Sequence, residues 1–375
     1  MNQTLALLLD AYRELNAKRM FWIVLVISGL VVLAFCMIGV TNDPNAYSQH
    51  ITLMGVRTPL PALLSRAAMF KLAFTSLGIK LWLTWVAMIL AIISTSSMFP
   101  DLMTGGSIDL YLCKPISRLR LFLTKYAAGL LFVGLQVTAF SAASFVVIGW
   151  RGGSWEPRIF LAVPLVVSTF SYLWCLSVLL GVKTRSTLAA ALLTMIAWLL
   201  IAGVDQTETV LLMVKTHSRQ VVDGYGIRLK TTEAQAKAAR ISLAATQPTT
   251  QETDHVTNLE TRWHRVQAER AVDAKTLKDV SMIHTIAYRL KTMLPKTRET
   301  NELLDRSLLS RDELHELDES QDQRRRGPAW TAPEVFAEAK ETIRSRSVGW
   351  IMGTSFIFEL VVMALAARSF CRRDF

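Results

Sequence analysis

Cysteine is scarce in this chain of 375 residues, which contains four, and none of them lies in the long hydrophilic segment 205–346. No disulfide framework is therefore expected there. The histidines are scattered through polar sequence, without the Cys and His spacing of a zinc site. The patterns G-x-x-x-x-G-K-[ST], G-x-S-x-G and H-E-x-x-H are also absent. We therefore expect no catalytic residues, no metal site and no cofactor site in this chain, and we do not expect an enzyme.

Charge is also sparse, because charged residues make up 19% of the chain against 51% hydrophobic residues. The mean hydropathy is +0.33. A helix needs roughly 20 apolar residues to cross a lipid core about 30 Å thick. Six runs approach or reach that length: residues 21–40, 81–99, 127–150, 159–182, 187–204 and 348–367. The sequence therefore predicts an all-α integral membrane protein with six transmembrane helices and a helical extracytoplasmic domain inserted between the fifth and the sixth.

The formal net charge of +11 indicates topology rather than nucleic-acid binding, because much of the excess lies in short segments beside the apolar runs. If the N-terminus is cytoplasmic, the short inner segments carry twelve Lys and Arg residues and the short outer segments carry six. This asymmetry follows the positive-inside rule. We expect a multi-pass protein of the plasma membrane, in particular a bacterial inner membrane, with both termini in the cytoplasm and lipid as its surroundings.

Four parts of the chain are predicted from these runs. Residues 1–20 repeat leucines at three- and four-residue steps, which indicates an amphipathic helix on the inner interface or, alternatively, a continuation of the first span. Residues 21–205 hold spans one to five, and residues 347–375 hold the sixth span and a cytoplasmic tail. Residues 206–346 form the extracytoplasmic domain.

That outer domain is predicted to be a helical hairpin followed by shorter helices. Apolar residues of 256–280 fit a heptad frame that Arg270 and Asp273 interrupt, which favours a hairpin over an unbroken coiled coil. Pro248 and Pro295 mark expected breaks. Thr331 to Glu334 has the spacing of a capping box, so we expect a helix to begin there and to run into the last span.

The segment that joins the second and third runs carries a more specific pattern. It contains an acidic residue, a glycine turn, an apolar stretch, a Pro-Ile-Ser-Arg sequence and a lysine that opens the next run: Asp101, Gly105, Gly106, residues 108–113, Pro115 to Arg118, and Lys125. This order resembles the cytoplasmic loop of type-2 ATP-binding-cassette (ABC-2) transporter permeases. Residues 370–375 are similar to the ending of that family. The resemblance covers nearly all of the membrane part and none of the outer domain.

The resemblance implies a permease subunit that works with a separate cytoplasmic ATP-binding subunit and with a second permease subunit, in a homodimer or heterodimer. Segment 100–120 would then be a coupling segment that inserts into the ATPase. Asp101 would anchor it, Gly105 and Gly106 would permit its turn, and Pro115 would set the entry into the third span. Arg118 and Lys125 would hold acidic partner residues or lipid phosphates, although ordinary positive-inside topology explains both cations equally well.

The last apolar run contains a carboxylate, Glu359, near its middle. Burying an unpaired carboxylate in lipid costs at least a few kcal/mol, so Glu359 should be protonated, paired or facing a polar cavity. Gln136 in the third run is a candidate partner. The residue types are compatible with a role in a transport pathway and with a structural hydrogen bond between helices.

These features favour a transmembrane permease of an ABC-2 exporter or a related assembly, with ATP bound only by the partner. The alternative is a membrane-anchored scaffold or sensor without transport activity, whose outer domain binds a partner.

A topology experiment tests this orientation. A cysteine introduced between residues 105 and 114 should be protected from an impermeant thiol reagent in intact cells, because the positive-inside rule places that loop in the cytoplasm. A cysteine introduced near His264 should be labelled. Labelling of the first site from outside would overturn the orientation.

Overall fold

The computed structural model describes residues 13, 19–42, 48–53, 56–61, 70–71, 74–103, 117–245, 250–308 and 332–372. Contacts divide the chain into two compact units. We call the first the membrane unit; it contains Met1–Gly203, Thr292–Asp318 and Ser347–Phe375. We call the second the hairpin unit; it contains Val204–Lys291 and Glu319–Arg346.

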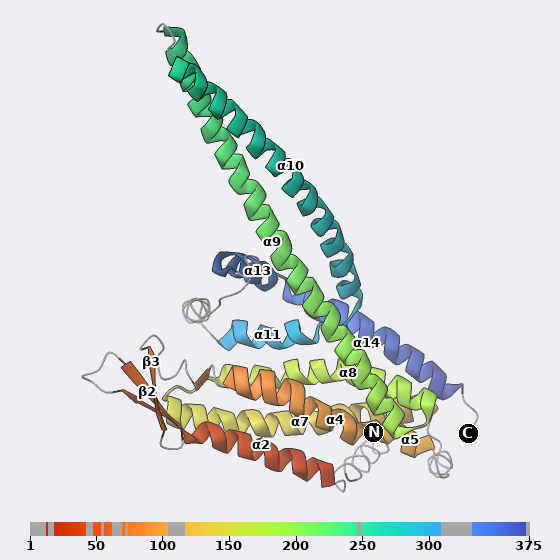
Figure 1. The fold of residues 1–375 in the computed structure, drawn as a ribbon. Helices are drawn as coiled ribbons and strands as arrows, with labels where there is room; N and C mark the ends of the chain where they lie inside the picture. The colour runs from red at the N-terminus through yellow and green to blue at the C-terminus, as the bar shows by residue number, and fades with distance from the viewer. Residues whose placement is uncertain are drawn as a thin grey trace. The chain divides into compact units, whose positions relative to one another are not determined.

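The membrane unit is a bundle in which α8 occupies the centre (Figure 1). Helix α8 packs against α7, α14, α11, α4 and α5, and α2 packs against α7. The described helical segments of this unit are α2 (Arg19–Met37), η1 (Phe74–Ala87), α4 (Met88–Ser96), α5 (Met98–Met103), α7 (Arg118–Val147), η2 (Ile148–Gly152), η3 (Pro157–Leu161), α8 (Ala162–Thr184), the first part of α9 (Thr187–Ala245), α11 (Thr297–Leu308) and α14 (Val348–Cys371).

Five helices among the described residues are long and apolar enough to cross a membrane. They are Phe74–Met103, Arg118–Gly152, Pro157–Thr184, Thr187–Ser242 and Val348–Cys371. They correspond to the second through sixth predicted spans, so the prediction of a multi-pass helical protein is confirmed in this coarser form. The apolar helix at the first predicted span, Phe21–Met37, is shorter than these five.

The first predicted span ends early because the chain enters a small sheet. Strand β1 (Ile38–Asn42) pairs antiparallel with β2 (Ser48–Leu53), which pairs antiparallel with β3 (Val56–Pro61). Ile38 lies opposite Leu53, and Ser48 lies opposite Pro61. The described chain is otherwise helical and compatible with the predicted all-α class, so this small sheet is a local element that the prediction did not include. The β-branched residues of β1 and β2 favour extended backbone, although hydropathy alone made residues 38–40 look like part of the span.

The second span begins seven residues before the predicted start at Leu81. Its first segment, η1, is π-helical, and the helix continues through α4 and, after a turn at Ser97, through α5. From the sequence, Lys80 is expected at the outer edge of the span, with its side chain reaching the lipid headgroups. In the structure Lys80 forms an ion pair with Asp305 of α11, with 2.6 Å between Nζ and Oδ2.

Helix α11 belongs to the membrane unit, although its sequence falls within the predicted outer domain. Its apolar side chains Leu303, Leu304 and Leu308 are buried, and it contacts α8, η1, α14 and η3. The boundary 206–346 therefore does not coincide with the division that the contacts give.

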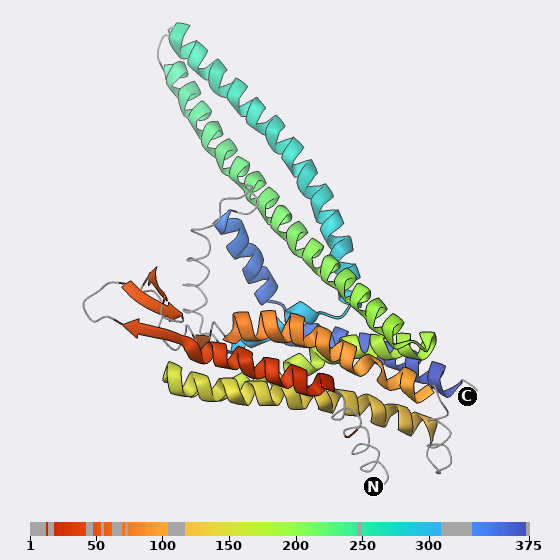
Figure 2. The ribbon, with the colours of Figure 1, turned by 60° about the horizontal axis from the view of Figure 1, so that its bottom comes forward.

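The hairpin unit consists of the second part of α9, α10 (Thr250–Met293) and α13 (Pro333–Arg344). Figure 2 shows α9 and α10 as two long neighbouring helices. Arg240 of α9 forms an ion pair with Glu260 of α10, and Gln220 donates a 2.7 Å hydrogen bond to Glu338 of α13. The predicted helical hairpin is thus observed. Two details differ: α9 continues from the fifth span without a break, and α13 ends at Arg344 rather than running into α14, which Ser347 caps.

Helix α7 approaches α8 closely at Gly129, where a Cβ atom would lie 2.9 Å from the ring of Trp174. Gly129→Ala should lower the apparent unfolding temperature in detergent, because overpacking of this kind costs about 1–3 kcal/mol. Gly134→Ala is the control on the same helix. Its nearest atom is at 3.7 Å, and alanine favours helix there. Equal unfolding temperatures for the two variants would contradict the close packing.

Candidate functional site

Glu359 lies within α14 and binds two hydroxyl groups from neighbouring helices. Tyr126 of α7 donates a 2.8 Å hydrogen bond to Oε1, and Ser171 of α8 donates a 2.9 Å hydrogen bond to Oε2. Tyr126 and Ser171 are buried, while Glu359 is half-buried. The carboxyl group therefore links three membrane helices. No Lys, Arg or His among the described residues forms an ion pair with it.

Each hydroxyl group has a second acceptor within reach. Tyr126 Oη lies 3.3 Å from the carbonyl oxygen of Ser171, and Ser171 Oγ lies 2.8 Å from that of Ser168. A hydroxyl carries one proton and can also accept a hydrogen bond. The two hydroxyls can donate to an ionised carboxylate. Alternatively, one can turn its proton to a backbone carbonyl and accept from a protonated carboxyl group. The site thus satisfies hydrogen bonds in both protonation states of Glu359.

The predicted partner Gln136 does not bind Glu359. Gln136 is buried, and its Nε2 atom has no hydrogen-bond partner among the described residues. It lines a small apolar cavity with residues of α2, η1, α4, α7 and α8. Gln136 and Tyr126 are ten residues apart on α7, almost three helical turns, so the two side chains lie at different heights in the bundle.

A second polar cluster holds α11 against the bundle. Asn301 of α11 contacts Thr169 of α8 at 2.9 Å and donates to Thr84 of η1 at 2.8 Å. The buried Lys296 precedes α11, and its ammonium group donates to Thr354 of α14 and lies 4.3 Å from the centre of the Trp350 ring. Asn301 and the preceding Lys296 therefore bind polar groups of the membrane helices, which favours the packing of α11 there.

The predicted coupling segment is described only at its two ends. Gly105, Gly106 and Pro115 lie outside the described residues. Asp101 is exposed on α5, and Arg118 begins α7, where its Nη1 atom donates a 3.3 Å hydrogen bond to the carbonyl oxygen of Cys371 at the end of α14. Lys125 is buried, with 3% of its surface exposed, so it does not present its charge on a surface of this unit.

Four buried aromatic rings connect the ends of this segment to the bundle. Phe99 of α5 lies 5.2 Å from Phe122 of α7, 6.0 Å from Trp174 of α8 and 6.3 Å from Phe370 of α14, between ring centres. Phe122 and Phe370 are 5.7 Å apart. Trp174 also donates a hydrogen bond to the carbonyl oxygen of Tyr126. This aromatic cluster therefore lies one contact away from the Glu359 site.

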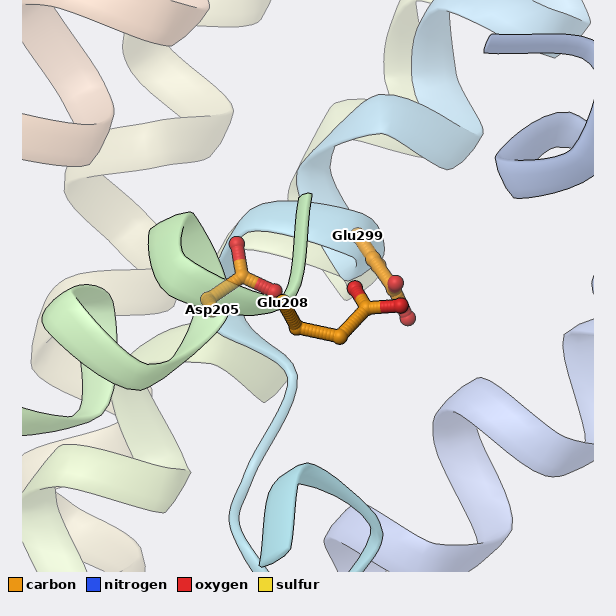
Figure 3. Close-up of side chains that lie close together, drawn as sticks. All are labelled: Asp205, Glu208 and Glu299. Atoms are coloured by element: carbon orange, nitrogen blue, oxygen red, sulfur yellow. The ribbon is translucent and has the colours of Figure 1, made fainter. Parts of the chain in front are cut away.

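The hairpin unit contains a separate buried charge cluster. Glu208 of α9 accepts from Lys291 of α10 at 2.9 Å and from Arg346 at 2.5 Å, and His284 Nε2 lies 3.3 Å from it. Lys291 also pairs with Asp205, which Figure 3 shows beside Glu208 on α9. Glu299, also labelled there, belongs to α11. The cluster joins α9, α10 and the end of α13.

The ionised form of Glu208 is strongly favoured. Burial alone would raise its pKa, but the hydrogen bonds from His284 and Arg346 and the charge of Lys291 outweigh burial and hold the pKa well below its usual range. Glu208 is four residues beyond the apolar run that ends at Val204. It serves as the common acceptor for cations that come from two other segments.

Sequence reasoning found Glu359 but missed its partners. Tyr126 and Ser171 are separated from it by more than 180 residues, and hydroxyl residues are common in the apolar runs. Glu208 lies only four residues beyond an apolar run, but the cations that bind it are 76 or more residues away in sequence, so no local pattern indicated them. No family model, curated protein or solved structure matches this chain.

Removal of the charge at Glu208 should open the base of the hairpin. Glu208→Gln leaves Lys291 and Arg346 without their shared carboxylate, and breaking a buried ion pair costs about 3–5 kcal/mol. We expect hydrogen exchange in residues 204–212 and 281–293 to become more than tenfold faster. Glu233→Gln, which removes an exposed pair with Lys237 on the same helix, is the control and should change little.

The same cluster gives a pH dependence with a defined sign. Because folding lowers the pKa of Glu208, its ion pairs stabilise the hairpin unit fully at pH values above the unfolded-state pKa of about 4.3. This stabilisation is lost as the pH falls further, towards the lower pKa of the folded state. Wild-type exchange in these peptides should therefore accelerate below about pH 4.3 more than that of Glu208→Gln. Parallel pH profiles would contradict the assignment.

Proposed function

We propose that this chain is the permease subunit of an ATP-driven transporter of the ABC-2 type, with both termini in the cytoplasm of a bacterial inner membrane. A separate ATP-binding subunit would dock on segment 100–120, and a second permease subunit would complete the pathway. The chain itself would carry no ATPase activity. The proposal depends first on the resemblance of the segment from Asp101 to Lys125 to the coupling loop of that family.

The packing at both ends of that segment supports the proposal. Phe99 lies just before the segment and Phe122 just after it, and both contact Phe370 at the end of α14. Arg118 adds a hydrogen bond to the same end of α14. A displacement of the docking segment would therefore also displace α14, the helix that carries Glu359, because closely packed aromatic side chains have low compressibility.

The Glu359 site is the second support. It joins α7, α8 and α14 through side-chain hydrogen bonds to the carboxyl group of Glu359. A carboxylate in a membrane helix is costly and marks a pathway more often than a simple anchor does. A scaffold or sensor would need the spans only as anchors. The long hairpin fits either function, so the coupling of ATP hydrolysis to this chain separates the two.

Purification from native membranes tests the proposal. The tagged full-length chain, extracted in mild detergent and placed in nanodiscs, should carry a vanadate-sensitive ATPase with it. The double variant Gly105→Arg and Gly106→Arg should lose at least nine tenths of this activity, because two bulky cations would block the docking turn. Gly224→Arg on α9, where no atom lies within 4 Å of an added Cβ, is the matched control. Preparations without any ATPase would contradict the proposal.

A further inference from the structure

Among the described residues, the carboxyl group of Glu359 has hydrogen-bond donors but no ion-pair partner. The titratable side chains close enough to be affected by the charge of Glu359 include Tyr126 of α7 and Tyr172 and Cys175 of α8, and all three are uncharged when protonated. The cation contributed by the α11 segment, Lys296, is bound to Thr354, five residues away along α14. Neutral donors reduce the cost of an ionised carboxylate in lipid without cancelling its charge. Within the described part of the chain, an ionised Glu359 is therefore short of one positive charge.

The side of α14 next to Glu359 is apolar and exposed. Phe356 is 40% exposed and Leu360 is 69% exposed, and they occupy the positions three before and one after Glu359. Phe356 is held in place by an edge-to-face contact with Tyr172. A half-buried carboxylate beside apolar side chains is complementary to a molecule that has a positive charge on an apolar body.

The hydrogen-bond pattern adds a second requirement. The hydroxyls of Tyr126 and Ser171 each lie within reach of one oxygen of Glu359 and one backbone carbonyl. The site can therefore hold a neutral carboxyl group when it is empty and a carboxylate when a cation is present. A structural hydrogen bond between helices would need only one of these arrangements.

We propose that Glu359, with Tyr126 and Ser171, forms an intramembrane binding site for a lipophilic organic cation. The carboxylate of Glu359, bound by the two hydroxyl donors, pairs with the positive charge of the ligand. Phe356 and Leu360 contact the apolar body of the ligand. A lipophilic organic cation would then be the substrate class of the transporter proposed above. That role in transport rests on the proposed function, whereas the binding of the cation to Glu359 does not.

Binding of tetraphenylphosphonium to the purified full-length chain tests the site without any ATPase. We expect saturable binding, measured by equilibrium dialysis against empty micelles, and at least tenfold weaker binding to Glu359→Gln. Tetraphenylborate, which has the same shape and the opposite charge, should not compete.

Three variants separate the site from simpler explanations. Ser171→Ala removes one donor and should weaken binding less than Glu359→Gln does. Phe356→Ala should also weaken binding, because the apolar body of the ligand loses a contact. Glu341→Gln, which removes an exposed carboxylate of α13, should bind like the wild type.

Equal binding to Glu359→Gln, or competition by tetraphenylborate, would overturn the inference. Loss of oligomeric state in Glu359→Gln with unchanged cation binding would also overturn it and would assign the carboxylate to a contact between subunits. If the cation binds but no ATPase co-purifies, the site stands and the proposed transporter does not. If an ATPase co-purifies and the cation does not bind, the reverse holds.

Discussion

The cost of placing a carboxylate inside a membrane helix is the constraint on which the arrangement of α7, α8 and α14 depends. Glu359 cannot face lipid without partners, and the structure provides a hydroxyl group from each of the other two helices. Because Glu359 must reach both hydroxyl groups, the rotation of α14 about its own axis is fixed. The same rotation places Phe370 among the aromatic rings at the other end of the helix. One polar contact in the middle of the bundle and one apolar cluster at its end therefore support each other.

Much of the fold could be predicted because the solvent imposes a simple rule. Lipid requires long apolar helices. The run at residues 127–150 corresponds to the α7–η2 helix, the run at 159–182 to α8, and the run at 348–367 to α14, and each agrees within a few residues at one or both ends. The sheet could not be predicted from hydropathy, since strands and helix ends share the same apolar residues. Lys80 was misleading for a different reason: its counter-ion, Asp305, is distant in sequence.

The candidate site was predicted only in part. Glu359 stood out because a carboxylate is rare in an apolar run, whereas Tyr126 and Ser171 resemble many other hydroxyl residues. Gln136 was chosen as a partner by its polarity, but its distance from Tyr126 along α7 gives it a different depth in the bundle. Periodicity assigns a residue to a face of its own helix, and it contains no information about the register between two helices.

The three-stranded sheet has a property that affects how this protein behaves among other chains. An edge strand with free backbone groups invites pairing with a foreign strand, which is a route to aggregation. Strand β3 contains Pro59 and Pro61, and proline is tolerated in a strand where its missing N–H points away from the ladder. The outer side of β3 therefore lacks two of the donors that an added strand would need. Growth of this sheet by a further strand is disfavoured at β3, and β1 is the other edge strand among the described residues.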